Sequence, residues 1–555
     1  MDFEQEIKKE LSKILKRDIK LEIPPDSRLG DYAFPCFELA KDLKKDPNRI
    51  AKELSEKIIN KNFRVENKGP YLNFFVDKEK LIKEVLSKIL TEKEKYGILK
   101  KKRGKVMIEF SQANTHKAFH IGHIRGTSLG ESLARILEFT GHKVIRVNYQ
   151  GDTGMHVAKW LWCYNKFHKN EKFPRNNVEN WIASIYVEAV NKLEENQILQ
   201  EEVNKINFEL EEGKNKKLVA LWKKTRKLSL DAFDGIYKDL NTRFDNYFFE
   251  REVGKKGKEI ANWLVKRKIA RVDQGAVIVD LEKYNLGVWV LLRGDGTVLY
   301  SAKDIALAEI KFNRFKIDKS IYVVGAAQNL HIQQLFKTLE LMGFKRAKNC
   351  VYIPVSEVRL PTGKMSSRTG ENIVYSEFKK EIMDYAASEI KKRHDELNEK
   401  EIGKRALIIS MAAIKFDMLK QDLNKTIIFS KEEALKFEGD TGPYLQYSYA
   451  RAVSILKKAR KKSNFKIVEL KDKEIELIKK LDEFRIVVEQ ASNSLNPSLI
   501  ANYSFQLAQI FNEFYHLCPV IRSVEEGQRL AIVKAFLIVM KSSLRLLGIE
   551  VMEEM

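Results

Sequence analysis

The sequence predicts an α/β protein with a parallel sheet and a helical insertion, a small α+β domain before it and an all-helical domain after it. Three observations predict this arrangement. Residues 105–149 show strand, helix and strand patterns in succession, which is typical of a βαβ unit. Strand-like segments return after residue 275, and only amphipathic helix patterns follow residue 374. A length of 555 residues fits three or four domains at roughly 150 residues each.

The first hundred residues indicate a small mixed domain. A helical apolar pattern comes first, and the strand-like segment KGPYLNFFV occupies residues 68–76. A charged helix pattern begins at Asp77 and ends before the basic run Lys100–Arg103, which we interpret as a linker. We therefore place a first domain at residues 1–103.

The βαβ unit predicts where a ligand would bind. KVMIEF, residues 105–110, is followed by a polar loop and by a helix pattern that ends before Gly141, and KVIRVNY begins a second strand at Lys143. In such units ligands lie over the carboxyl ends of the strands. We expect the site at the loop that leads into the helix.

The remaining segments set the other domain boundaries. A highly charged helical pattern predicts an insertion over about residues 158–245. Strand patterns then return as GAVIVDL, VWVLL, SIYVVG and CVYIPV, and we interpret them as a return to the α/β domain, which would span residues 104–375. Residues 376–555 are predicted to be helical.

Composition limits the class of protein. The net charge of +23 indicates a polyanionic partner such as a phosphate backbone, with a general lysine bias as the equal alternative. The amino-terminal pattern is acidic and amphipathic, unlike an export signal, and no apolar run approaches the length of a membrane span, so we expect a cytoplasmic protein with no membrane association. The four cysteines are scattered, which favours buried thiols over a zinc site or disulfides: Cys36, Cys163, Cys350 and Cys518.

The most specific segment is SQANTHKAFHIGH, Ser111–His123, on the predicted loop between strand and helix. His120 and His123 would face the same way on the first helical turn, where free backbone N–H groups favour anions and the imidazoles can donate to phosphate oxygens. Gly122 leaves room for a planar base. A metal-binding pair lacks nearby Cys or carboxylate ligands, and the remaining alternative is a pair of incidental surface histidines.

A second basic loop, PTGKMSSRTG at residues 361–370, follows the last strand pattern. Lys364 and Arg368 can stabilise a developing pyrophosphate charge, and Ser366 and Ser367 add hydroxyl donors. Alone, this segment is compatible with any solvated turn. Together with the histidine segment, in this order, it is much more specific.

With both segments in place, the sequence resembles the class I aminoacyl-tRNA synthetases. HIGH stands at residues 120–123 and a KMSKS-type loop at residues 364–368, with Ser367 where many members carry a second lysine. Within the class the chain resembles the arginyl type, through EFSQANTHKAFHIGH (with Ala118 where a proline is usual), GDGTVLYSAKDIALA, YVVGAAQNLHIQQLF and FEGDTGPYLQYSYARA. The segments GDYAFPCFELAK and GPYLNFFV resemble that family's additional amino-terminal tRNA-binding domain.

The resemblance implies a Rossmann-type catalytic domain, a helical anticodon-binding domain, and roles for individual residues. Tyr300 and Asp304, four apart on a predicted helix, would recognise a guanidinium, which needs carboxylates as fork partners. The expected catalytic residues are His120, His123, Lys364 and Arg368, and the expected ATP-binding residues are Lys117, Gly122, Met365, Ser366 and Ser367. The expected arginine-binding residues are Glu109, Asn114, Tyr300, Asp304, Gln328 and Glu250, and the expected tRNA-binding residues are Tyr71, Asn73, Tyr444, Gln446, Tyr447 and Arg451. Taken singly and without the resemblance, each polar residue is better explained by an ordinary surface or core position.

The resemblance also implies a reaction. The enzyme would join L-arginine and ATP, with Mg²⁺ on the phosphates and no zinc, and pass arginine to the terminal 2′-hydroxyl of tRNA(Arg), with activation that depends on bound tRNA. We expect a monomer. Three alternatives remain: another class I synthetase, a small nucleotidylyltransferase that shares the HIGH loop, and an RNA-binding paralogue without activity.

Overall fold

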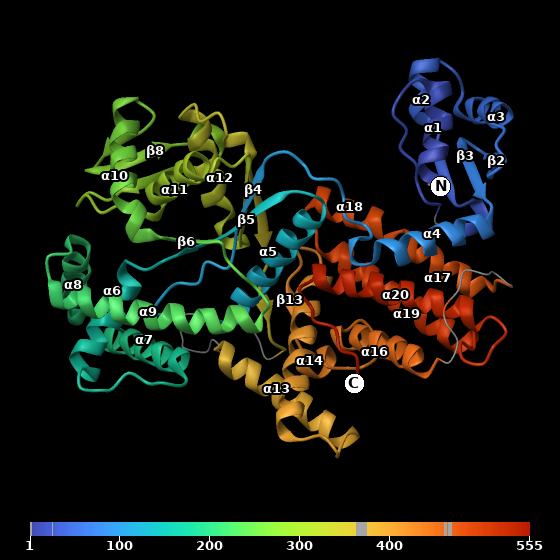
Figure 1. The fold of residues 1–555 in the computed structure, drawn as a ribbon. Helices are drawn as coiled ribbons and strands as arrows, with labels where there is room; N and C mark the ends of the chain where they lie inside the picture. The colour runs from blue at the N-terminus through green and yellow to red at the C-terminus, as the bar shows by residue number, and fades with distance from the viewer. Residues whose placement is uncertain (1–2, 25, 362–373, 460–462, 464–468) are drawn as a thin grey trace. The chain divides into compact units, whose positions relative to one another are not determined.

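The computed structural model describes residues 3–24, 26–361, 374–459, 463 and 469–555, and the chain divides into two compact units (Figure 1). The first unit contains residues 1–96, 451–484 and 509–540, and the second contains residues 97–450, 485–508 and 541–555. Among the described helices, none combines the length and apolarity that a membrane crossing requires. All four cysteines are buried with free thiols, as the sequence predicted.

The amino-terminal part of the first unit is a three-stranded antiparallel sheet with helices, which confirms the small α+β domain. The strand order is β1-β3-β2, with β1 at Tyr32–Pro35, β2 at Phe63–Lys68 and β3 at Tyr71–Val76. Apolar side chains of the first helix are buried at the spacing of one helical face, namely Phe3, Ile7 and Leu11. The helices are α1 (Phe3–Leu15), α2 (Phe37–Leu43), α3 (Pro47–Lys57) and α4 (Lys78–Glu92).

The second unit is built on a five-stranded parallel sheet of order β11-β10-β4-β5-β6, which confirms the predicted parallel sheet. The strands are β4 (Lys105–Glu109), β5 (Lys143–Gln150), β6 (Asn246–Phe249), β10 (Lys319–Gly325) and β11 (Cys350–Val355), and α5 (Ile121–Phe139) joins the first two. From β4 the chain adds strands first on one side and then on the other. The strand order therefore reverses beside β4, at the edge where open α/β sheets bind ligands.

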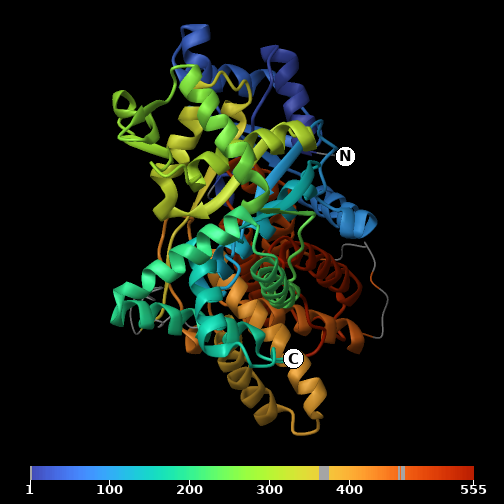
Figure 2. The same cartoon turned by 90° about the vertical axis from the view of Figure 1, so that its left-hand side faces the viewer.

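The predicted helical insertion lies between β5 and β6. It consists of α6 (Met155–Cys163), a π-helical turn (Tyr164–His168), α7 (Val178–Glu195), α8 (Gln200–Glu212) and α9 (Lys216–Asp239). Figures 1 and 2 show these helices grouped together on one side of the sheet in both views. Strand β6 itself was missed by the sequence analysis, because four residues are too few to show a period.

Two strand patterns belong to a different sheet from the one expected. GAVIVDL and VWVLL form β8 (Ala276–Asp280) and β9 (Val288–Leu292), which join β7 (Arg271–Asp273) in a separate antiparallel sheet. The connection over residues 281–287 is too short for a parallel crossover, so the strands pair as neighbours. SIYVVG and CVYIPV form β10 and β11 as predicted. The neighbouring helices are α10 (Glu250–Lys266), α11 (Tyr300–Phe315) and α12 (Asn329–Leu341).

The rest of the described chain is helical, as predicted, with one exception. Ile427–Ile428 (β13) pairs in parallel with Val358–Arg359 (β12), so the expectation of no strand after residue 374 was wrong at this point. A pair of residues carries no readable periodicity. The helices are α13 (Tyr375–Arg393), α14 (Glu399–Lys420), α15 (Lys431–Ala434), α16 (Gly442–Lys458), α17 (Asp472–Asp482), α18 (Phe484–Ser494), α19 (Ser498–Leu517) and α20 (Glu526–Leu546).

Candidate active site

The loop between β4 and α5 has a strained backbone. Ser111, Gln112 and His116 have φ angles of 78°, 47° and 61°, in the left-handed region that side chains disfavour. The loop is held in place by buried hydrogen bonds. The His116 ring contacts the Thr115 hydroxyl at 3.0 Å and the Thr225 hydroxyl at 2.8 Å, so that α9 of the insertion supports the loop. Such strain collects at functional sites, where the surroundings enforce it.

His120 and His123 form the first turn of α5 and cap it with their own side chains. Nδ1 of His120 accepts the N–H of Gly122, and Nδ1 of His123 accepts the N–H of His120, each at 3.2 Å. The ring centroids are 3.9 Å apart. Because both Nδ1 atoms act as acceptors, the ring proton of each neutral histidine is on Nε2. The pair thus offers two N–H donors.

Burial, together with the neighbouring Lys117, lowers the pKa of His120 to about 4 and holds the pKa of His123 well below its usual value. Both are therefore neutral donors at pH 7. The sequence predicts free backbone N–H groups at this helix start, but the N–H of Gly122 already donates to Nδ1 of His120. The absent side chain of Gly122 makes room for that ring, since a Cβ there would lie 3.1 Å from Nδ1 of His120.

A cleft of about 710 Å³ opens beside the two histidines. Asn114 and Lys117 line one wall, and polar residues of α7 line the other, where Lys117 Nζ lies 4.9 Å from the centroid of the Tyr186 ring. Val374 also lines the cleft and forms a β-bridge with His120. The predicted loop residues Lys364, Met365, Ser366, Ser367 and Arg368 lie outside the described residues.

Four carboxylates gather where strands β4, β5 and β6 end. Each is paired with a cation or an imidazole: Glu109 with Lys311 (2.6 Å), Glu250 with Lys303 (2.9 Å), Asp152 with Arg226 (2.6 Å) and Asp304 with His331 (2.6 Å). Burial raises the pKa of Glu109 and Glu250, against the opposing effect of their lysines. The four pairs make a strongly polar cluster, whose negative charges all act on the Tyr149 hydroxyl.

Glycine at position 151 brings two predicted residues together. A Cβ on Gly151 would lie 2.2 Å from Oδ1 of Asn114 and 3.2 Å from Oε1 of Glu250. Asn114 also lines the cleft of the histidines. The acidic cluster and the histidine cleft therefore adjoin each other at Asn114.

The other predicted pocket residues differ in exposure. Tyr300 and Asp304 both contact His331, the first through its ring at 4.7 Å and the second through Oδ2, so they do share one face of α11. The Tyr300 side chain is 58% exposed, and Gln328 is exposed on the turn after β10. Glu109 is only 4% exposed, and the structure places it as a buried partner of Lys311.

Five residues of this cluster were not predicted from the sequence: Tyr149, Asp152, Lys303, Lys311 and His331. The Tyr149 hydroxyl is buried with no hydrogen-bond partner among the described residues, and the negative charges of Asp304, Glu250, Glu109 and Asp152 act on it. Tyr149 and Asp152 stand at the carboxyl end of β5, where the rule used for Glu109 would have found them. No local signal marked Lys303, Lys311 or His331.

The predicted RNA-binding residues of the amino-terminal sheet lie on strand β3, along which successive side chains point to opposite faces of the sheet. Tyr71 and Asn73 are two residues apart and share one face. Tyr71 packs edge-on against Phe37, with ring centroids 5.3 Å apart, and Phe37 is 45% exposed. Asn73 is buried.

The four predicted residues of α16 divide into exposed and buried. Tyr447 is exposed and Tyr444 is half-buried against Phe505. Gln446 is fully buried, and its amide donates to the carbonyl of Glu550 at 2.7 Å, so its role in the structure is to join two segments and not to face RNA. Arg451 hydrogen-bonds Asn512 and lies over the Tyr515 ring.

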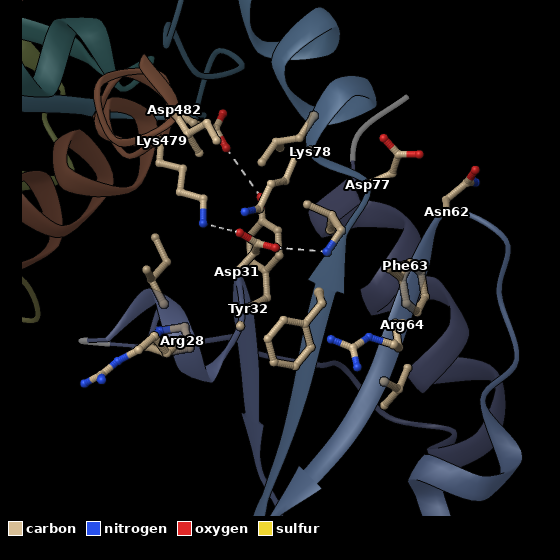
Figure 3. A pocket seen from close by; sticks show the side chains of 18 of the residues that line it. Arg28, Asp31, Tyr32, Asn62, Phe63, Arg64, Asp77, Lys78, Lys479 and Asp482 are labelled. Carbon is tan, nitrogen blue, oxygen red and sulfur yellow. Dashed lines mark hydrogen bonds and ion pairs between the residues drawn. The ribbon is translucent and has the colours of Figure 1, made fainter. Parts of the chain in front are cut away.

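The first unit holds a larger pocket of about 1380 Å³ between the edge of its sheet and α17 (Figure 3). Lys479 pairs with Asp31 at 2.5 Å, and the Tyr32 hydroxyl donates to Asp482 at 3.4 Å. Arg28 pairs with Asp26 outside the pocket lining. Because several of its charges are paired in this way, the pocket is not a simple anion site.

Cys163, His168 and Glu188 form a group with the atom types of a metal site. His168, however, contacts Glu171 at 2.6 Å and Glu188 at 2.8 Å through its two ring nitrogens. Burial opposes the charged form, but these two hydrogen bonds raise the pKa of His168 above its usual value. The arrangement is that of an imidazolium between two carboxylates.

Comparison with known proteins finds family matches along most of the chain. Residues 85–430 match the family described as tRNA synthetases class I (R), catalytic domain. Residues 445–555 match the DALR anticodon binding domain, and residues 1–76 match the arginyl tRNA synthetase N terminal domain.

Similar whole proteins are also known. The arginine–tRNA ligase of Clostridium perfringens is 39% identical over 546 residues, covering 96% of each chain, and that of Clostridium acetobutylicum is 38% identical over the full length of both. The solved arginyl-tRNA synthetase of Thermus thermophilus superposes with a TM-score of 0.85 at 26% identity, covering 99% of this chain and 100% of that chain. The Plasmodium falciparum arginyl-tRNA synthetase shares the fold, with a TM-score of 0.81 at 20% identity and 99% of both chains covered. The chain therefore belongs to the arginyl-tRNA synthetase family of the class I aminoacyl-tRNA synthetases.

Proposed function

We propose that this protein is an arginine–tRNA ligase that activates L-arginine with ATP and transfers it to tRNA(Arg). The observation that carries the proposal is that two groups of side chains adjoin at Asn114: a cluster of carboxylates suited to a guanidinium, and a cleft with two neutral imidazole donors suited to phosphate oxygens. A guanidinium presents five donors in a planar fork, and Asp304 and Glu250 are the acceptors best placed to receive them.

The chemistry requires positioning more than covalent catalysis. The arginine carboxylate attacks the ATP α-phosphorus, an acyl-phosphate bond forms, and the bond to pyrophosphate breaks. His120 and His123 donate hydrogen bonds from Nε2 to the phosphate oxygens, and Lys117 supplies positive charge beside them. Lys364 and Arg368 are proposed to act on the pyrophosphate, with Met365, Ser366 and Ser367 beside ATP. Mg²⁺ would arrive with the phosphates of ATP.

The second step transfers arginine to RNA. The terminal 2′-hydroxyl of tRNA attacks the arginyl carbonyl carbon, and AMP leaves. We propose that residues 1–103 bind the tRNA through Tyr71, since aromatic side chains stack on unpaired bases. Residues 104–375 would form the catalytic domain. Residues 376–555 would bind the anticodon through Tyr444, Tyr447 and Arg451. Activation would depend on bound tRNA, and the protein would act as a cytoplasmic monomer.

One assay tests this proposal. ATP–pyrophosphate exchange is measured with each of the twenty amino acids, with and without tRNA. Exchange with arginine alone among the twenty, strongest when tRNA is present, is the expected result. An absence of arginine-dependent exchange in the presence of tRNA would refute the assignment, and exchange with another amino acid would indicate a different class I specificity.

A further inference from the structure

His331 connects the main arginine-binding candidate to the second, antiparallel sheet. Its Nε2 lies 2.6 Å from Oδ2 of Asp304, and its Nδ1 lies 3.3 Å from the indole nitrogen of Trp289 on β9. The three side chains come from β9, α11 and α12. All are largely buried: Trp289 is 4% exposed, and the side chains of His331 and Asp304 are 11% and 19% exposed.

The direction of these hydrogen bonds is fixed by the tryptophan. An indole nitrogen can only donate, so Nδ1 of His331 must be the acceptor and carry no proton. The proton of the neutral imidazole is then on Nε2, and it is donated to Asp304. Doubly protonated His331 would have no acceptor for the Trp289 N–H. The chain Trp289 to His331 to Asp304 therefore selects an uncharged imidazole.

A neutral donor has a particular consequence for the carboxylate. It orients Asp304 through Oδ2 but leaves the negative charge uncompensated. Oδ1 has no hydrogen-bond partner within the described part of the chain and is available to a ligand. The other two pocket carboxylates on this side, Glu109 and Glu250, are instead paired with lysines. Asp304 is thus the pocket carboxylate whose partner adds no charge.

We propose that His331 is a positioning residue for arginine recognition, held by Trp289 as a neutral Nε2–H donor that orients Asp304 while preserving its charge for the substrate guanidinium. This inference rests on the proposed function, because it assigns a purpose within the arginine pocket. It extends that function to two residues, Trp289 and His331, that would act on the substrate through Asp304. The Tyr300 ring, whose centroid lies 4.7 Å from that of His331 in an edge-to-face arrangement, helps to hold the imidazole in place.

The test compares two donors that differ in charge. His331→Gln keeps an uncharged N–H donor, whereas His331→Lys supplies a donor with a permanent positive charge beside Asp304. In arginine-dependent ATP–pyrophosphate exchange with tRNA present, we expect KM for arginine to rise at least about tenfold in His331→Lys and in His331→Ala, the scale of one charge-assisted hydrogen bond. We expect His331→Gln to stay within about threefold of wild type. In all three, kcat and KM for ATP should change little.

Trp289→Phe supplies an independent variant, because it removes the donor and retains an aromatic ring. We expect a smaller rise in KM for arginine and, in ¹⁵N-histidine spectra, loss of the pure Nε2–H tautomer of His331. Thermal melts of every variant separate misfolding from a binding defect.

The outcomes distinguish the two proposals. Wild-type protein without arginine-dependent exchange would refute the proposed function. Wild-type activity together with equal KM values for arginine in His331→Gln and His331→Lys would overturn only the proposed role of His331. A loss of kcat and of affinity for ATP in all variants would also overturn it, because that result would indicate a general structural role.

Discussion

Single residues of the site are tuned by burial more than by charge partners. Burial lowers the pKa of His116 and His156 to about 3 and that of His120 to about 4. Each imidazole is kept neutral, and each therefore has defined donor and acceptor atoms. In the proposed function the histidines present N–H donors to phosphate oxygens, and fixed tautomers suit that role better than mobile charges.

These buried histidines predict a pH dependence of stability. Their folded-state pKa values lie below the unfolded value near 6.5, so the unfolded chain binds more protons at acid pH. Their stabilisation is complete above about pH 6.5 and is lost as pH falls toward 4, by up to about 1.4 kcal/mol per pH unit for each histidine. The free energy of unfolding, measured by urea titration, should fall markedly between pH 7.5 and pH 5 for the wild type and should fall less for His116→Gln. The exposed His516→Gln variant is the control, and an equal fall in all three would contradict the prediction.

We expect the substitution Asp304→Ala to impair arginine activation and to leave tRNA binding intact. Removing the carboxylate leaves the guanidinium without its fork partner, so arginine-dependent exchange should fall at least about a hundredfold, the upper range of a charged hydrogen bond. Affinity for tRNA, measured by filter binding, should persist. Asp231→Ala, on the exposed face of α9, serves as the control. Loss of tRNA binding with exchange intact would mean that the arginine pocket lies elsewhere.

At the scale of the element, α5 is important because it carries the two histidines at its start and packs on β4. Two glycines on its buried face differ in how closely neighbouring atoms approach them. A Cβ on Gly130 would lie 2.1 Å from Cγ of Phe110, whereas a Cβ on Gly126 meets nothing within 4 Å. The close approach at Gly130 sets how near α5 lies to the segment after β4.

A matched pair of substitutions tests this contact. Gly130→Ala should destabilise the protein by about 1–3 kcal/mol, because Phe110 is buried and cannot move freely. Gly126→Ala should be neutral or stabilising by up to about 1 kcal/mol, because alanine has less backbone entropy to lose. The measurement is the shift of the urea unfolding midpoint. Equal shifts of the same sign would show that α5 does not depend on this close approach.

At the scale of the whole molecule, Arg125 of α5 ties together segments far apart in sequence within the second unit. Its side chain is fully buried and donates to the carbonyls of Ser356 at 2.9 Å, Lys425 at 2.8 Å and Asp422 at 3.0 Å. Burial lowers its pKa to about 10, so it remains charged at pH 7. The helix that begins at the histidines is thereby fixed to the segment after β11 and to the chain before β13.

The substitution Arg125→Lys tests how much these hydrogen bonds contribute to the free energy of unfolding. A single ammonium cannot donate to carbonyls on both sides as the planar guanidinium does, so buried carbonyls lose their donors. We expect a loss of about 3 kcal/mol in the free energy of unfolding, measured by urea titration. Arg243→Lys, whose side chain is 66% exposed, should change it by less than about 0.5 kcal/mol. Indistinguishable midpoints for the two variants would refute a junction role.

The sequence by itself determined the order of the elements, the βαβ unit, the insertion and the position of the histidine pair. Each follows from local periodicity, or from the residue types of one short segment, as for His120 and His123. Family resemblance also predicted arginine-binding roles for Asn114 and Asp304, with Glu250 as a further candidate carboxylate, and these roles stay predictions. The structure adds that Asn114 and Glu250 meet at Gly151.

Only the tertiary structure decided which sheet each strand joined and which partner each pocket residue received. The segments GAVIVDL and VWVLL have strand periodicity whichever sheet they join. The sequence also does not show whether the Gln446 side chain faces solvent or donates to the carbonyl of Glu550. The pairs of Glu109 with Lys311 and of Asp304 with His331 join distant segments. Such partners are selected by packing and charge complementarity in three dimensions, and periodicity along one segment carries no information about them.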